Sequence, residues 1–123
     1  MNELQIEEEI IKGVVVIKLS GLVDSANSHL LENRLGELID QGHVRLVFDL
    51  SDIDYISSAG WGIFVSEMKG IREKDGDLKL SGMAPDVRDV FELLEFDSLL
   101  TPYNDVSEAI IDFDEEKSND YVE

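Results

Sequence analysis

The chain has 123 residues, 43% of them hydrophobic, and a formal net charge of −18 at pH 7. That length fits one domain with one core, and so acidic a surface repels nucleic-acid phosphates and anionic membranes. The lack of cysteine excludes disulfides and thiolate metal sites, and no apolar run in the sequence is long enough to cross a bilayer. We therefore expect a cytoplasmic protein that contacts neither nucleic acid nor membrane directly. Its charge favours partners with basic surfaces, or else serves only solubility.

The N-terminal residues predict a β-hairpin. Residues 4–8 alternate between apolar and polar side chains, as in a half-buried edge strand. A Lys-Gly pair at residues 12–13 then gives a turn, and residues 14–19 form a strongly β-branched run. We expect the Ser-Gly pair at residues 20–21 to end this second strand.

Helix and strand patterns alternate from there on. Asn27 or Ser28 can cap a helix that ends at Gly42. Residues 44–50 are apolar on both faces, which is typical of a central strand. Residues 61–71 return to helical spacing, so a strand and a helix follow each other directly.

The C-terminal third continues the alternation. Residues 78–80 predict a short strand, and Pro85 suits the first turn of the next helix. A last short strand at residues 99–100 precedes a closing helix with Phe113 on its apolar side. The end of the chain is acidic and lacks periodicity, which predicts a flexible tail over residues 112–123.

The order of these elements defines the expected architecture. A hairpin followed by alternating helices and strands indicates an α/β fold, and the hairpin makes its sheet mixed. We expect a single domain over residues 1–111, with a mixed four- to five-stranded sheet and helices packed mainly on one face.

The most informative segment runs from Val44 to Gly62 and reads VRLVFDLSDIDYISSAGWG. It places a Ser-Ser pair and two glycines, Gly60 and Gly62, at the start of the predicted helix. Because glycine in a helix costs about 1 kcal/mol relative to alanine, the two together cost roughly 2 kcal/mol. Small residues are therefore needed there for close packing, for a phosphate or for a protein partner.

Three chemistries associated with strand-to-helix turns lack a required residue. A nucleophile elbow has glycine where this chain has Ile56, and both histidines precede the serines. A phosphate-binding loop needs a lysine that does not follow Gly62. A response-regulator receiver with Asp49 as acceptor would need an acidic pair after its first strand and a lysine after its fifth. Asp52 and Asp54 are interpreted as polar turn residues, although a phosphatase or hydrolase using these aspartates stays open.

Ser57 and Ser58 have two interpretations. Serine is among the best N-cap residues, and a cap contributes about 1 kcal/mol. A helix N-terminus also favours a phosphate, since its free amides and the macrodipole face that group. Trp61 is in helical register with Phe64, which favours a core position, whereas an outward Trp61 would anchor an interface.

Two segments resemble the STAS domain, as found in bacterial anti-sigma factor antagonists: FDLSDIDYISSAGWG and the earlier SGLVDSANSHLLENRL. The resemblance implies that Ser58 is the phosphorylation site, with Ser57 as a minor alternative, and that Asp24 lies beside it. The sequence departs from the family at Ser57, where aspartate is common, and at Trp61, where leucine is common. The partner-binding surface implied by the resemblance comprises Asp24, Ser25, Ser57, Ser58, Gly60, Trp61 and Gly62.

The resemblance also implies a function and partners. In such proteins the unphosphorylated antagonist binds an anti-sigma factor that is a serine kinase, and this frees a sigma factor. The kinase uses Mg-ATP to phosphorylate the antagonist, which ends binding, and a serine phosphatase restores the active form. We thus expect a monomer or weak dimer with no enzymatic activity, cofactor or metal of its own. The alternative is a constitutive STAS binding or scaffold module in which Ser58 only caps the helix.

Overall fold

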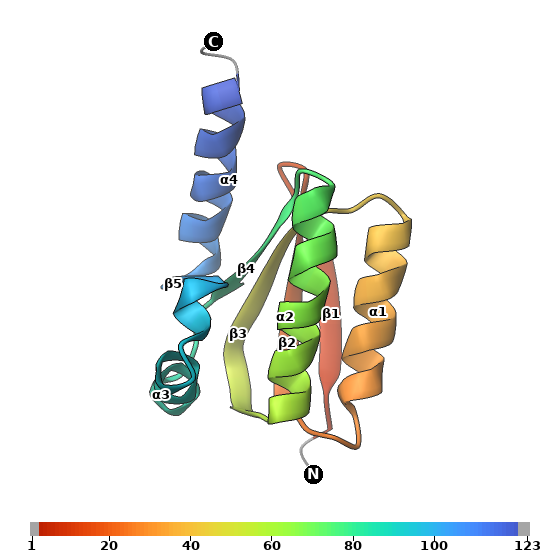
Figure 1. Ribbon diagram of the computed structural model, residues 1–123, viewed down its shortest axis with the longest axis vertical. Coiled ribbons are helices and arrows are strands. Elements are labelled where there is room, and N and C mark those ends of the chain that lie inside the picture. The colour runs from red at the N-terminus through yellow and green to blue at the C-terminus, as the bar shows by residue number, and fades with distance from the viewer. Residues whose placement is uncertain (1–2, 121–123) are drawn as a thin grey trace.

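In this computed structural model the structure describes residues 3–120, which form a five-stranded sheet and four α-helices (Figure 1). The elements in chain order are β1 (Gln5–Ile11), β2 (Val14–Val23), α1 (Ser28–Asp40), β3 (Arg45–Ile56), α2 (Ser58–Glu73), β4 (Asp77–Ser81), α3 (Pro85–Leu93), the 3-10 turn η1 (Phe96–Ser98), β5 (Thr101–Tyr103) and α4 (Val106–Asp120). Within these residues, no helix combines the length and the apolar character needed to span a membrane.

The sheet is mixed, as predicted. Its strands lie in the order β1-β2-β3-β4-β5, with β1 antiparallel to β2 and every other pair parallel. The antiparallel pair is the predicted hairpin, and each parallel pair is joined by a crossover that contains a helix. β3 lies at the centre and is buried on both faces along its first half, as its apolar run predicts.

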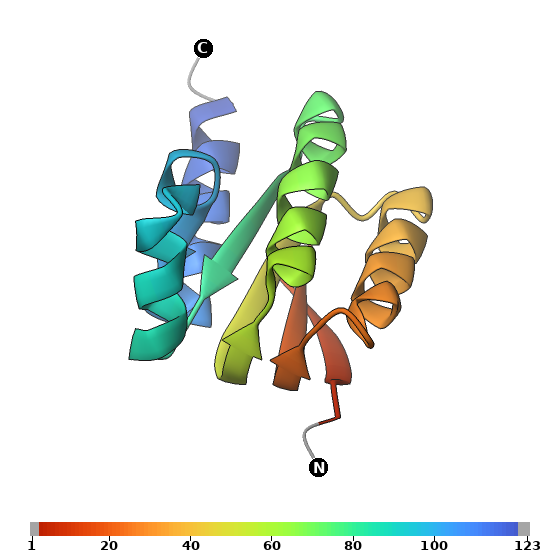
Figure 2. The ribbon, with the colours of Figure 1, turned by 60° about the horizontal axis from the view of Figure 1, so that its bottom comes forward.

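The helices cover the two faces of the sheet unequally. Figure 2 shows α1, α2 and α3 in front of the sheet and α4 behind it. The larger core lies beneath the first three helices and includes Leu35, Phe64 and Phe91. A smaller core forms between α4 and the other face, where Val47 of β3 and Phe113 are both buried. The prediction that helices pack mainly on one face is confirmed.

The closing helix is longer than the sequence predicts. α4 runs to Asp120, so the boundary expected between residues 111 and 112 falls inside it. Phe113 is buried, and Asp112 accepts a hydrogen bond from Lys79 Nζ at 3.0 Å. Asp112 and Phe113 therefore belong to the packed helix, because a buried cation and an apolar sheet face bind this turn, whereas the flexibility predicted for the rest of the tail stays a prediction. Residues 121–123 of that tail lie outside the described residues.

β2 and β3 also extend beyond the strands that the sequence predicts. β3 is 12 residues long, and in its second half Leu50, Ile53 and Ile56 are buried at a spacing of three. That spacing fits a strand because the pairing of β2 with β3 contains two register shifts, which disrupt the regular alternation. The extension pairs Val23 with Ile56, and so it brings together the loops that follow the two strands.

Candidate functional site

The predicted serines lie where the C-terminal ends of β2 and β3 meet the start of α2. The backbone N–H of Ser57 donates to the carbonyl of Val23 at 2.8 Å, and the N–H of Trp61 donates to the carbonyl of Ser57 at 3.0 Å. The first bond joins Ser57 to the end of β2, and the second begins the helix. The position of the Ser-Ser pair is therefore determined by both strands.

The two serines divide the roles that the sequence left open. Ser57 is the N-cap residue of α2, with an extended backbone and a side chain that accepts the N–H of Gly60 at 3.3 Å. Ser58 is the first helical residue, and it is exposed. Among the described residues, none forms a hydrogen bond with the Ser58 hydroxyl. Capping is thus the role of Ser57, which leaves Ser58 as the accessible hydroxyl on the first turn.

Gly60 and Gly62 are small for different reasons. A Cβ on Gly60 would lie 2.8 Å from Ile56 Cγ2 and 2.8 Å from Val23 Cγ1, so any larger residue would push α2 away from both strands. A Cβ on Gly62 would meet nothing within 4 Å, and Gly62 is exposed. Close packing therefore explains Gly60, whereas Gly62 leaves open backbone on the surface that also carries Ser58.

Trp61 is a core residue and not an exposed interface anchor. Its side chain is 1% exposed and stacks on Phe96 at 5.3 Å between ring centroids, with further ring contacts to Phe91 and Phe64. Its indole N–H has no acceptor among the described residues. Gly60 and Trp61 of the predicted partner-binding surface are both buried, and their contact with a partner stays a prediction. Aromatic packing between α2 and α3 explains tryptophan at this position.

Asp24 shapes the loop beside the serines. Its Oδ1 accepts the backbone N–H groups of Ala26 at 2.9 Å and Asn27 at 3.0 Å. Asn27 in turn accepts the N–H of Asp24 and donates to the carbonyl of Leu22, so it does not form the predicted side-chain cap of α1. Because Val23 is bonded to Ser57, this loop lies against the start of α2. Asp24 is half-buried and Ser25 is exposed on the same loop.

The three aspartates of β3 do not form a common site. Asp49 accepts hydrogen bonds from the backbone and hydroxyl of Ser51, while Asp52 pairs with Lys18 at 3.2 Å. The hydrogen bond to Asp52, together with the charges of Asp52 and Asp49, raises the pKa of Lys18. Asp52 and Asp54 belong to a strand, not to the turn that the sequence predicts. This separation gives no support to hydrolysis by the aspartates.

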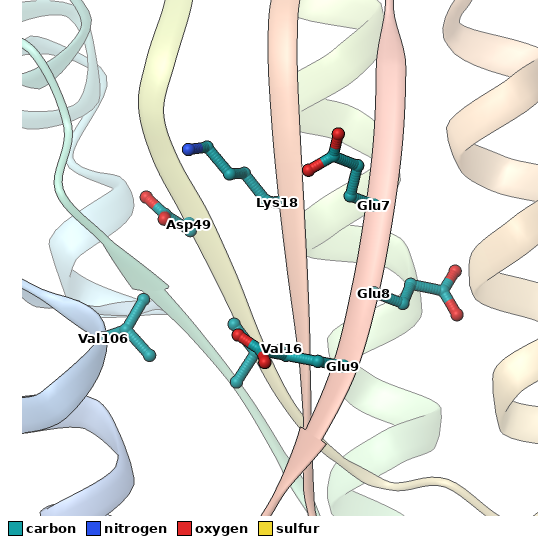
Figure 3. Close-up of a pocket in the computed structure, with 7 residues that line it drawn as sticks. All are labelled: Glu7, Glu8, Glu9, Val16, Lys18, Asp49 and Val106. Atoms are coloured by element: carbon teal, nitrogen blue, oxygen red, sulfur yellow. The ribbon is translucent and has the colours of Figure 1, made fainter.

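A hollow on the sheet face that carries α4 is lined by Asp49 of β3 and by glutamates of β1. Figure 3 shows Lys18 and Asp49 on neighbouring strands, beside carboxylates of β1. Its lining residues are Glu7, Glu8, Glu9, Val16, Lys18, Asp49 and Val106. Lys18 is thus a cation among acidic neighbours on this face of the sheet.

A second cavity adjoins the serine site and was not indicated by the sequence. It has a volume of about 230 Å³ and is lined by Asp54, Tyr55, Ile56, Trp61, Asp86, Val87 and Val90. Val90 of α3 is an apolar side chain that is nevertheless 38% exposed, and it forms part of the wall of this cavity. We name this cavity the Trp61 pocket.

The fold and the site together define a small mixed α/β domain that presents, on the first turn of a central helix, an exposed serine whose hydroxyl bonds to none of the described residues. The STAS domain family matches residues 5–109, so the chain belongs to the STAS family. The family resemblance in the serine segment is thereby confirmed.

Named relatives and a solved structure agree with this assignment. BtrV of Bordetella bronchiseptica, provisionally named an anti-sigma factor antagonist, is 40% identical over 94 residues, which cover 76% of this chain and 81% of BtrV. The anti-sigma F factor antagonist of Paenibacillus polymyxa is 24% identical over 112 residues, 90% of this chain and 96% of that protein. A Thermotoga maritima crystal structure, also provisionally named an antagonist, superposes with a TM-score of 0.79 at 25% identity and covers 87% of this chain and 92% of its own.

Proposed function

We propose that this protein is an anti-sigma factor antagonist, and that phosphorylation of Ser58 switches it off. In the unphosphorylated form it binds an anti-sigma factor that is a serine kinase, and a sigma factor is released. The observation that carries this proposal is the exposed Ser58 hydroxyl on the first turn of α2, beside a Ser57 that already supplies the cap. The names of the relatives support the general role.

The geometry favours a phosphate on Ser58 without a change of fold. A phosphoserine adds between 1.5 and 2 negative charges, roughly, and the start of a helix tolerates them because its amides and macrodipole face that group. The first turn of α2 contains no acidic side chain to oppose the added charge. The phosphate would occupy the surface next to Gly62, where the backbone is open. It would therefore block a docked partner and leave the domain folded.

The chemistry of the switch belongs to the partners. The kinase transfers the γ-phosphoryl group of Mg-ATP to Ser58 Oγ, so a P–O bond to ADP breaks, a P–O bond to serine forms, and the hydroxyl proton passes to a base of the kinase. A serine phosphatase returns the hydroxyl by hydrolysis. This chain supplies the serine that receives the phosphoryl group and holds it in position. Ser57 is the weaker phosphorylation site because its Oγ already accepts a hydrogen bond from the N–H of Gly60.

Phosphorylation mapping with matched serine variants tests this function. Wild type, Ser58→Ala and Ser57→Ala are incubated with Mg-ATP and the cognate kinase, and phosphate is located by mass spectrometry. We expect phosphate on Ser58 in wild type and in Ser57→Ala, and none in Ser58→Ala. Ser58→Asp should bind the kinase more weakly than Ser58→Ala. Wild type that stays unmodified while Ser58→Asp binds as tightly as wild type contradicts the switch and supports a constitutive binding module.

A further inference from the structure

We propose that the Trp61 pocket receives one apolar side chain, flanked by lysine or arginine, from the same anti-sigma factor that covers Ser58. This inference rests on the proposed function and adds to it a second contact of stated chemistry. The pocket is formed by the end of β3, the first turn of α2 and the first turns of α3.

The pocket is continuous with the serine surface. Ile56 and Trp61 both lie at its base: Ile56 immediately precedes Ser57, and Trp61 lies three residues after Ser58. Three residues of helix span about 4.5 Å. A partner that covers the Ser58 hydroxyl therefore reaches the mouth of the pocket without a separate docking event.

The size and lining of the pocket suit a protein side chain. Its volume of about 230 Å³ is below the roughly 300–1,000 Å³ of small-molecule sites. Ile56, Trp61 and Val87 are at most 4% exposed and form a packed apolar base. Tyr55 at 53% and Val90 at 38% exposed form open walls. An apolar side chain would cover both walls and exclude water from them, as the central residues of protein interfaces do.

The rim gives the pocket a charge preference. Asp54 and Asp86 are exposed lining residues, and neither forms an ion pair within residues 3–120. A cation beside the inserted side chain would meet both carboxylates. A second copy of this chain, at a net charge of −18, would bring repulsion instead. Charge complementarity therefore favours a basic partner over self-association.

Matched substitutions on α3 test the pocket. Val90→Asp changes a pocket wall, whereas Leu93→Asp changes a residue of the same helix that is 80% exposed and does not line the pocket. The affinity of the unphosphorylated full chain for its cognate anti-sigma factor is measured by calorimetry. We expect a loss of about tenfold or more for Val90→Asp, and a change of less than about twofold for Leu93→Asp. Thermal unfolding of each variant reports whether it is folded.

A second pair of variants tests the charged rim and keeps the proposal testable if Val90→Asp unfolds. Asp86→Asn should weaken binding and flatten its salt dependence more than Asp89→Asn, which alters an exposed carboxylate outside the pocket. Tyr55→Ala, in the opposite wall, should weaken binding as well. Equal effects of the pocket and control variants overturn the proposal, as does a dimer of this chain that Val90→Asp dissociates. A wild type that fails to bind the kinase or is unaffected by phosphorylation contradicts the proposed function instead.

Discussion

Lys79 Nζ, at the centre of β4, lies 3.0 Å from Asp112 Oδ2 in α4. The Lys79 side chain is 1% exposed, and its ammonium lies 4.4 Å from the ring centroid of Phe113. Asp77 and Tyr103 each approach the same ammonium at 3.3 Å, and the Tyr103 hydroxyl donates to Asp112. α4 is therefore held on the sheet by a buried cation as well as by apolar contact.

The two members of this pair should differ in their effect on stability. Asp112→Ala removes an anion from a buried ammonium, so we expect a loss of about 1–3 kcal/mol in the free energy of unfolding. Lys79→Met replaces the buried cation with an apolar chain and leaves carboxylates that are partly exposed and can be solvated by water. The free energy of unfolding should therefore fall less in Lys79→Met than in Asp112→Ala. Urea unfolding of both variants gives the order. A larger loss in Lys79→Met would contradict this account of how α4 is held.

The same network predicts a stability change at high pH. Burial and the hydrogen bond to Asp112 raise the pKa of Tyr103 to about 12. The pKa of Tyr103 in the folded state lies above its unfolded value of about 10. The protonated Tyr103 hydroxyl therefore contributes its full share to the free energy of unfolding below pH 10, and this share is lost as the pH rises towards 12. Tyr103→Phe has no such group to titrate. The difference in unfolding free energy between wild type and Tyr103→Phe should therefore shrink across that window; a constant difference would contradict the prediction.

Asp112, which accepts the hydrogen bond from Tyr103, has its pKa shifted in the opposite direction, so its effect on stability appears at low pH. The hydrogen bond from Tyr103 lowers the pKa of Asp112, and the hydrogen bond and charge of Lys79 act in the same direction. A lowered folded pKa contributes stability that is present above the ordinary value near 3.8 and is lost as pH falls through the folded pKa. The free energy of unfolding of Asp112→Asn should consequently fall less between neutral and acidic pH than that of wild type. Asp114→Asn, on a more exposed carboxylate of the same helix, serves as the control.

The serine pair should separate capping from switching. Ser57→Ala removes the acceptor of the Gly60 N–H, so we expect about 1 kcal/mol less stability. Ser58→Ala removes a hydroxyl that no described residue bonds, so its stability should stay within about 0.5 kcal/mol of wild type. Thermal unfolding monitored by circular dichroism measures both. The reverse order would assign the cap to Ser58 and weaken the proposed switch.

The glycine pair should give changes of opposite sign. Gly60→Ala places a methyl group 2.8 Å from atoms of Ile56 and Val23, which overpacks the core and costs about 1–3 kcal/mol. Gly62→Ala meets nothing and gains helix propensity, so it should stabilise the fold by up to about 1 kcal/mol. Chemical denaturation compares the two. If Gly62→Ala keeps its stability but loses affinity for the kinase, open backbone at Gly62 is needed for docking.

Much of the architecture follows from local patterns. The hairpin and the alternation of strands and helices are visible because side-chain periodicity of two or 3.6 residues is a property of short segments. The serine at a helix start is visible for the same reason. The second half of β3 was missed because its buried residues have a spacing of three, which neither period matches.

The distribution of roles within the site depends on contacts between distant residues. Sequence alone determined that a strand would deliver two serines and two glycines to a helix start in an acidic α/β domain. Only the tertiary structure decided that Ser57 is the cap, that Gly60 is required by Val23 of another strand, and that Trp61 is buried beside a pocket. It also decided that the helix continues past Asp112, because the anion that binds Lys79 comes from 33 residues away. Burial and ion pairing are properties of neighbours in space, and no local pattern contains them.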